Sequence, residues 1–257
     1  MIDSTAVVQL VKCVGALATA ALLVGCATPP ADSDRASAEL AGSGWARASA
    51  GGTGDAAWSH QSFPGKRVSR YAPQRKDGRD VLMVHAVSSA SMVRRKVRIE
   101  PGGLGRLAFS WLVPAVIETA DLARRESDDS PVRLILAFEG DRSRFSAKDT
   151  MLSELAETLT GEPLPYATLM YVWSNRSEAE SVIVNPRTSR IRKLVLESGP
   201  GQLSRWLNYE RDVRADFIKA FGEPPGALLS IGVMTDTDNT KSQASAWYGP
   251  VRLLPAK

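Results

Sequence analysis

Short apolar runs separated by turn-forming residues dominate the chain from residue 58 onward. The runs are rich in β-branched and aromatic residues, and Gly, Pro, Asn and Asp lie between them, as at Pro101-Gly102-Gly103 and Asn185-Pro186. Such spacing is typical of strands joined by turns. The pattern therefore predicts a mainly β fold, an antiparallel β-sandwich. Its predicted strands cover residues 81–87, 104–113, 132–138, 168–174, 181–184, 191–196, 228–234 and 245–254.

Two segments follow a helical period instead. In residues 147–159, leucines recur at helical spacing, Asp149 is placed to cap the start, and Gly161 follows the end. In residues 213–221, apolar side chains share one helical face, and Gly222 terminates the segment. Neither segment can form a core alone, so we predict one or two peripheral helices packed on the sandwich.

Residues 26–57 differ in composition from the rest of the chain. They are rich in Ala, Ser, Gly, Pro and Asp, and Leu40 and Trp45 are their only large apolar residues. A segment of this composition cannot bury enough apolar surface to order itself. We predict a flexible tether over residues 26–57, followed by a single β-sandwich domain over residues 58–257.

The N-terminal segment has the pattern of a secretory leader. Residues 13–25 form an apolar run after Lys12, which has the length of a signal-peptide core and is too short to span a bilayer comfortably. The run ends in Leu23-Val24-Gly25-Cys26, which resembles the lipobox of bacterial lipoproteins. This resemblance implies that residues 1–25 are removed and that acylated Cys26 anchors the protein in a lipid membrane.

The residue after the cysteine implies a location. Ala27 stands where the sorting rule of Gram-negative lipoproteins places Asp for retention in the inner membrane, so the resemblance implies an outer-membrane lipoprotein that faces the periplasm or the cell surface. Asp3 in the leader departs from the usual basic pattern. The alternative is a leader that is cleaved without lipidation.

Composition and motifs exclude several classes of function. The 32 basic and 28 acidic residues are interspersed, so the net charge of +4 does not predict nucleic-acid binding. Cys13 lies in the leader, so the domain after Cys26 has no disulfide, thiol nucleophile or zinc–thiolate site. His60 and His85 are the two histidines, and the chain contains no G-x-S-x-G elbow and no phosphate-binding loop.

The C-terminal half carries distinctive short motifs. They are 171–175 (YVWSN), 185–188 (NPRT), 221–225 (FGEPP), 234–240 (MTDTDNT) and 246–249 (AWYG). Together they resemble the bacterial domain-of-unknown-function family numbered 3047, and the resemblance extends from about Phe63 to Leu254. The closing strand, acidic turn and strand are also similar to galactose-binding-like modules, which implies a jelly roll and, by fold analogy alone, sugar binding. Lys241 departs from the family, which usually has Gly there.

The acidic turn offers a candidate metal site. Asp236, Asp238 and Asn239 place oxygen ligands close together, and Ca²⁺ prefers six to eight such ligands. An EF-hand is excluded, because Lys241 and Trp247 occupy the positions that need Gly and Glu. The alternative is a hairpin turn in which these side chains accept backbone N–H groups.

A second set of residues is a candidate ligand site. Asp128, Asp129 and Arg133 precede and enter an apolar strand, where they are suited to hydrogen-bond sugar hydroxyls or to form a structural ion pair. Aromatic side chains stack on sugar rings, although core packing is the commoner fate of a strand tryptophan. The remaining candidates for this ligand site are Trp111, Trp173 and Asn175.

These observations support one main hypothesis and two alternatives. The first is a non-catalytic module that binds a carbohydrate or another envelope glycan. The second is a carboxylate-dependent polysaccharide hydrolase, which needs two carboxylates facing each other across about 5 to 9.5 Å. The third is a scaffold lipoprotein that binds envelope proteins through a flat apolar patch.

Overall fold

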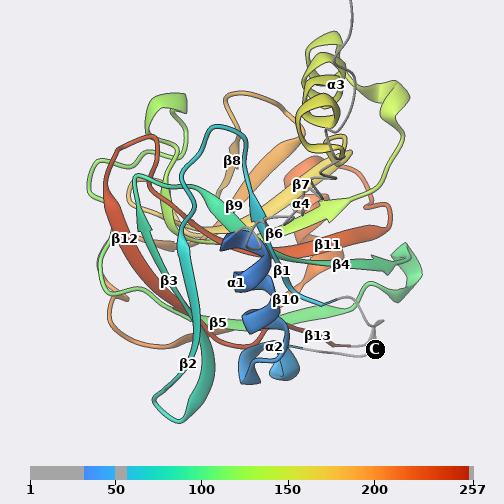
Figure 1. Ribbon diagram of the computed structural model, residues 1–257. Coiled ribbons are helices and arrows are strands. Elements are labelled where there is room, and N and C mark those ends of the chain that lie inside the picture. Colours follow the sequence, from blue (N-terminus) through green and yellow to red (C-terminus); the bar gives the residue numbers. More distant parts are fainter. Residues whose placement is uncertain (1–31, 50–56, 255–257) are drawn as a thin grey trace, which may run out of the picture.

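The computed structural model describes residues 32–49 and 57–254, and they fold into two β-sheets that pack face to face (Figure 1). The seven-stranded sheet has the order β1 (Ser59–Ser62), β4 (Ser91–Ile99), β11 (Leu228–Asp236), β6 (Ser130–Phe138), β7 (Ala167–Ser174), β9 (Ile191–Ser198), β8 (Val182–Val184). The second sheet has the order β10 (Leu207–Asp212), β5 (Arg106–Leu112), β12 (Gln243–Tyr248), β3 (Arg79–Val87), β2 (Arg70–Lys76), and β13 (Arg252–Leu254) also pairs with β5. The predicted mainly β sandwich is confirmed.

One strand pairing differs from the predicted antiparallel pattern. β7 and β9 run parallel, with Thr168 beside Ile191, whereas the other described pairs are antiparallel. Parallel neighbours need a crossover connection. Residues 175–190, which include β8, supply it, and β8 then pairs antiparallel with β9. This connection brings the β8–β9 loop close to the outer face of the seven-stranded sheet.

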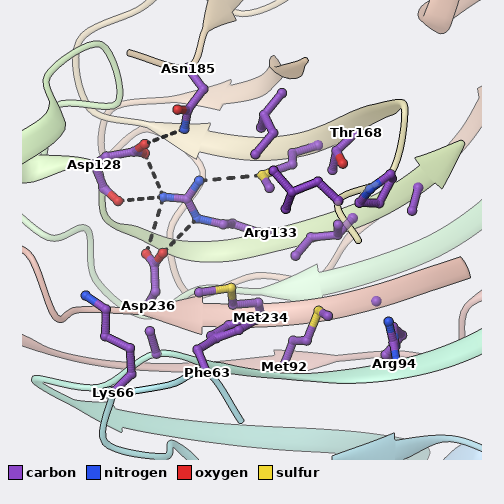
Figure 2. A pocket seen from close by; sticks show the side chains of 18 of the residues that line it. Phe63, Lys66, Met92, Arg94, Asp128, Arg133, Thr168, Asn185, Met234 and Asp236 are labelled. Carbon is purple, nitrogen blue, oxygen red and sulfur yellow. Dashed lines mark hydrogen bonds and ion pairs between the residues drawn. The ribbon is translucent and has the colours of Figure 1, made fainter. Parts of the chain in front are cut away.

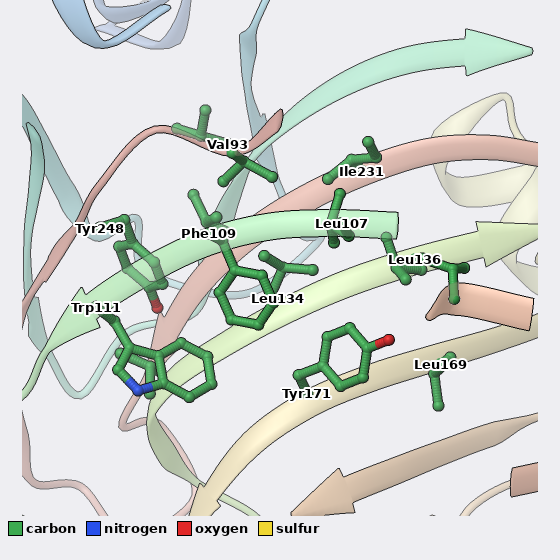
Figure 3. Close-up of a cluster of buried hydrophobic side chains, with 14 of the residues drawn as sticks. Val93, Leu107, Phe109, Trp111, Leu134, Leu136, Leu169, Tyr171, Ile231 and Tyr248 are labelled. Atoms are coloured by element: carbon green, nitrogen blue, oxygen red, sulfur yellow. The ribbon is translucent and has the colours of Figure 1, made fainter. Parts of the chain in front are cut away.

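The main core lies between the sheets and is built by alternation along each strand. In β6, Val132, Leu134, Leu136 and Phe138 point into this core, while the residues between them point to the outer face. Aromatic rings fill the centre (Figure 3). Phe109 stacks on Tyr171 at a centroid distance of 5.6 Å, and Trp111 is tilted against Phe109 at 5.3 Å.

Both predicted helices are present, and each has clear end signals. α3 (Ala147–Thr160) begins after Ser146, whose side chain caps it, and ends at Gly161 in the left-handed conformation. The sequence predicted Asp149 as the cap, and this was wrong: the capping residue is Ser146. α4 (Val213–Phe221) begins after Asp212 and ends at Gly222. Three short 3₁₀ turns lie at η1 (Pro101–Gly103), η2 (Arg125–Ser127) and η3 (Arg142–Arg144).

The predicted flexible tether is wrong for residues 32–49. This stretch forms α1 (Asp32–Ala41) and α2 (Gly44–Ala48), which pack on the sandwich. Leu40 and Trp45 are buried in the main core, and Trp45 Nε1 donates a hydrogen bond to the Gly249 carbonyl at 2.9 Å. The apolar residues that were too few to form a core alone are sufficient to join one that the strands already provide.

The predicted leader and Cys26 lie outside the described residues. Among the helices of residues 32–49 and 57–254, none is long and apolar enough to cross a membrane. The membrane anchor through Cys26 therefore stays a prediction.

Candidate functional site

A hollow of about 350 Å³ lies on the outer face of the seven-stranded sheet (Figure 2). Its floor consists of outward-facing residues of adjacent strands: Met92 from β4, Gly232 and Met234 from β11, Ile135 from β6 and Met170 from β7. Gly232 contributes no side chain to the floor, and a Cβ atom there would contact Met92 Sδ at 3.4 Å. The floor is therefore apolar, and its flexible thioethers can adapt to the shape of a ligand.

Loops from distant parts of the chain supply the walls of the hollow. Phe63 and Lys66 come from the segment between β1 and β2, and Leu164 and Pro165 precede β7. The polar wall comes from the β8–β9 loop and the β11–β12 turn, which contribute Asn185, Arg187, Asp238 and Asn239.

A buried ionic network centred on Arg133 closes the polar end of the hollow. Arg133 Nη2 donates to Asp128 Oδ1 at 2.9 Å and to Asp236 Oδ1 at 3.3 Å, as Figure 2 shows. Arg133 Nε forms an ion pair with Asp236 Oδ2 at 3.2 Å. The third nitrogen, Nη1, donates to the Met170 thioether at 3.7 Å, which is a weak acceptor. The Nη1 donor that faces the apolar floor thus has only a weak acceptor, and Nε is paired with Asp236 by charge without a hydrogen bond.

A second cation, Lys193, stabilises the other side of this network. Lys193 projects from β9 and is fully buried, and its Nζ lies 2.6 Å from Asp128 Oδ2. It also donates to the Leu122 carbonyl at 2.7 Å. Asn185 Nδ2 donates to the same Asp128 oxygen at 3.1 Å. Both oxygens of Asp128 are therefore occupied by donors.

Burial and charge shift the pKa values of these groups in opposite directions. Burial opposes the charge of Asp128, but Arg133 and Lys193 lower its pKa below the ordinary value. Burial raises the pKa of Asp236 to about 7 despite the attraction of Arg133. Burial lowers the pKa of Lys193 to about 8, and repulsion from Arg133 acts in the same direction. Asp236 and Lys193 thus change charge closer to neutral pH than is usual for their types.

The acidic turn between β11 and β12 is held by Asp129. Its Oδ1 accepts from the Asn239 side chain at 2.9 Å, and its Oδ2 accepts from the Thr240 backbone N–H at 2.7 Å. Asp238 forms an ion pair with Lys66. The turn is therefore held by a carboxylate from another segment, and not, as the alternative predicted, by Asp236, Asp238 and Asn239 accepting its backbone N–H groups.

The predicted metal ligands are only partly brought together. Carboxylate oxygens of Asp129, Asp236 and Asp238 lie within 4.8 Å of one another. Asn239 is not part of this group, because its amide nitrogen donates to Asp129 and its oxygen accepts from Arg187 at 3.3 Å. Lys66 and Arg133 already balance two of the three carboxylates. Calcium binding here stays a prediction.

The predicted sugar-binding residues have different fates. Asp128, Asp129 and Arg133 join the Asp236 turn at the polar end of the hollow, so two sets that were predicted separately form one cluster. Trp111 and Trp173 are wrong as ligand platforms, because both are buried on the inner face of their strands. Trp173 Nε1 donates to the Gly199 carbonyl at 2.9 Å.

The prediction that Asn175 belongs to the ligand site is also wrong. Its side-chain nitrogen donates to the carbonyl of Ile117, and Asn175 does not line the hollow. It therefore positions a loop rather than a ligand.

Sequence reasoning missed Lys193 and the methionine floor. Lys193 stands between Ile191 and Val195 on the outward-facing side of a predicted strand, and a lone cation in an otherwise apolar alternation is a signal of a buried ion pair. The three methionines of the floor come from three different parts of the chain, so only the strand order places them together.

The fold and the hollow define a class: a two-sheet β-sandwich with a ligand-sized depression on its outer face and a buried ionic network at one end. The family model "Protein of unknown function (DUF3047)" matches residues 56–252. The chain therefore belongs to the DUF3047 family, as the sequence motifs predicted. None of the curated protein sequences matches this chain.

Two solved structures are similar at low identity. The xyloglucanase domain of NopAA, a type three effector from Sinorhizobium fredii in complex with cellobiose, is 10% identical, with a TM-score of 0.40 and coverage of 77% of this chain and 92% of that chain. Endoglucanase 3 of family GH12 from Trichoderma harzianum is 9% identical, with a TM-score of 0.40 and coverage of 79% and 91%.

Proposed function

We propose that this protein is a non-catalytic, membrane-anchored glycan-binding protein of the cell envelope, and that its ligand binds in the outer-face hollow. The observation that carries the proposal is the convergence of hydrogen-bonding side chains from two strands and several loops at one end of an apolar depression. Concave sites with an apolar lining and a few converging polar groups are the usual form of small-ligand sites.

The polar end suits a neutral, hydroxyl-rich ligand. Acidic and basic groups there pair with one another, so a ligand charge of either sign has no excess of opposite charge to meet. Arg133 Nη1 offers N–H donors whose present partner is the Met170 sulfur, and Asp238 and Asn239 offer acceptor oxygens. A sugar hydroxyl both donates and accepts, so it can use both kinds of group.

The same pairing argues against hydrolysis. A glycosidase needs one carboxylic acid that can donate a proton and a second carboxylate placed to act on the sugar. Burial gives Asp236 the raised pKa of a general acid, but its Oδ1 accepts from the Ser130 backbone N–H and from Arg133, and its Oδ2 faces Arg133 Nε, so both oxygens are engaged within the protein. Asp238 pairs with Lys66. We therefore favour binding without catalysis.

The test is thermal unfolding of the purified full chain, with Cys26→Ser to prevent acylation, across a panel of soluble glycans. A bound glycan at a hundred times its dissociation constant stabilises the fold by about 2.7 kcal/mol. We expect at least one glycan to raise the melting temperature without being consumed. A parallel series with chelator and added Ca²⁺ tests the acidic turn as a metal site.

Two paired variants localise the effect. Lys66→Met with Asp238→Asn removes an ion pair at the polar end without leaving either charge unpartnered, and should abolish the glycan-induced rise. The matched control, Arg106→Met with Glu210→Gln, removes an ion pair from the second sheet and should keep the rise. Glycan cleavage would establish the hydrolase instead, and the absence of a shift with every glycan would favour a protein-binding scaffold.

The membrane anchor needs its own test. The lipobox ending in Cys26 supports acylation, and each buried methylene of an acyl chain contributes about 0.8 kcal/mol to membrane binding. We expect the full chain to incorporate labelled palmitate in a Gram-negative host and to fractionate with the outer membrane. Cys26→Ser should lose both properties, and unchanged labelling of this variant would exclude lipidation at Cys26.

A further inference from the structure

A second hollow of about 400 Å³ adjoins the first and runs beneath α3. Its apolar wall on the helix side consists of Leu152, Leu155, Ala156 and Leu159. The residues that line both hollows are Phe63, Met92, Arg94, Leu164 and Pro165. The two hollows therefore adjoin, and we call them together the groove, which extends from the Arg133 network, across the methionine floor, to α3.

The face of α3 beside this groove is apolar and exposed. Leu155 and Leu159 are 52% and 57% exposed, although they lie one helical turn apart on the same side. From Leu152 to Leu159 the helix offers a stripe roughly 10 Å long. Contiguous exposed apolar side chains next to a ligand site mark a surface that an apolar group covers.

The two charged residues that line the middle of the groove, Arg94 and Glu162, pair with each other. Arg94 makes a two-pronged contact with Glu162, with Nη1 to Oε2 at 2.7 Å and Nη2 to Oε1 at 3.1 Å. Lys96 also pairs with Glu162. The groove thus has a polar end at Arg133, where acidic and basic side chains pair with one another, and an apolar end at α3. Between the two ends, Arg94 and Lys96 share Glu162 as their partner.

We infer that the ligand is an amphiphile, whose neutral sugar head lies at the Arg133 end and whose hydrocarbon chain crosses the methionine floor and lies against Leu155 and Leu159. This inference rests on the proposed glycan-binding function and extends it, because it adds an alkyl or acyl chain to the ligand. Its basis is that the two hollows adjoin and share lining residues, that the charges at one end are balanced, and that the leucines at the other end are exposed.

The test is calorimetric titration of the full chain carrying Cys26→Ser with methyl, hexyl, octyl and decyl β-glucosides and maltosides, all below their critical micelle concentrations. Each methylene that enters the groove should raise the affinity, up to about fourfold when it is fully buried. We expect the rise to continue through the shorter chains and to level off once the groove is filled.

Variants on α3 separate a groove from general adsorption. Leu155→Gln with Leu159→Gln should flatten the dependence on chain length while affinity for the methyl glycosides is unchanged. Met151 is the matched control, because it is 60% exposed on the same helix but does not line the groove. Met151→Gln should bind the whole series like the unmodified protein.

The outcomes separate the two proposals. Equal affinity for methyl and octyl glycosides would overturn the amphiphile and leave glycan binding in place. If affinity depended on chain length but the methyl glycosides did not bind, the result would support binding of the hydrocarbon chain in the groove and contradict recognition of the sugar head. An equal loss in Met151→Gln and in the leucine variant would show adsorption to exposed apolar surface and overturn the inference, and no binding of any probe would overturn both proposals.

Discussion

The two faces of the seven-stranded sheet are made by the same strands but hold opposite chemistry. On β6, Leu134 and Leu136 point into the aromatic core between the sheets, whereas Arg133 and Ile135 point to the outer face. Every residue of β6 is buried, so burial alone does not distinguish the faces. The difference lies in the partners: the inner face is filled by apolar packing, and the outer face holds charges that depend on each other.

The strongest test of this comparison removes a large ring from the inner face. Trp173→Ala should reduce the free energy of unfolding by roughly 3–5 kcal/mol, because it leaves a cavity in the core. Urea denaturation measures the change. Trp206→Ala is a control, since Trp206 is only partly buried and its Nε1 contacts exposed Asp77. If Trp173→Ala were as stable as the unmodified protein but had lost glycan binding, Trp173 would belong to the ligand site and not to the core.

The inner face is also the part of the fold that the sequence predicts best. Strands such as β6, β7 and β11 have runs of apolar residues because both of their faces are covered. β4 was missed, since Arg94, Lys96 and Arg98 alternate with its core residues and resemble a basic surface cluster. The strand β10 was missed for a related reason, because its partly buried and exposed residues alternate along a charged segment.

Arg133 is the corresponding test of the outer face. Arg133→Met keeps an apolar stem but leaves Asp128 and Asp236 without their shared cation, so we expect a loss of roughly 3 kcal/mol in the free energy of unfolding. Adding Asp236→Asn to this variant should restore part of the loss at alkaline pH, where Asp236 would otherwise be ionised without its cation. A neutral Arg133→Met variant would show that the network contributes little to stability.

The candidate site could be predicted in pieces but not as a whole. The sequence identifies each part as a candidate, because charged residues lie beside apolar strands at Asp128, Asp129, Arg133 and the Asp236 turn. Their convergence depends on β11 pairing with β6, a contact between segments about a hundred residues apart. The tryptophans were misassigned because residue type does not reveal which face of a strand points inward when both faces are apolar.

The pH dependence of stability offers a finer test of the outer face. The pKa of Asp236 is about 7 in the fold against an ordinary 3.8, so between these values the folded chain holds a proton that the unfolded chain releases. The contribution of Asp236 to stability therefore falls as the pH rises from about 4 to about 7 and is constant above. Asp128 acts in the opposite sense: its pKa is lowered, so its stabilisation is lost as the pH falls through the acidic range.

Asp236→Asn should remove the Asp236 part of this slope. Urea midpoints measured across the interval from about pH 4 to about pH 7 should fall less steeply for the variant than for the unmodified protein. Trp206→Ala, which does not touch the network, should keep the original slope. Identical slopes in Asp236→Asn and the unmodified protein would mean that Asp236 is ionised throughout the interval.

The smallest expected effect comes from an ion pair at the exposed edge of the same face. Arg98 Nη2 lies 3.0 Å from Glu139 Oε2, much like the distances around Arg133, but the two side chains are 57% and 51% exposed. Water and salt screen such a pair, and its loss leaves no buried charge behind. Arg98→Met should therefore leave the urea midpoint unchanged, in contrast with Arg133→Met. If both variants lost the same stability, pairing geometry rather than burial would govern the strength of these contacts, and the distinction between the two ends of this face would fail.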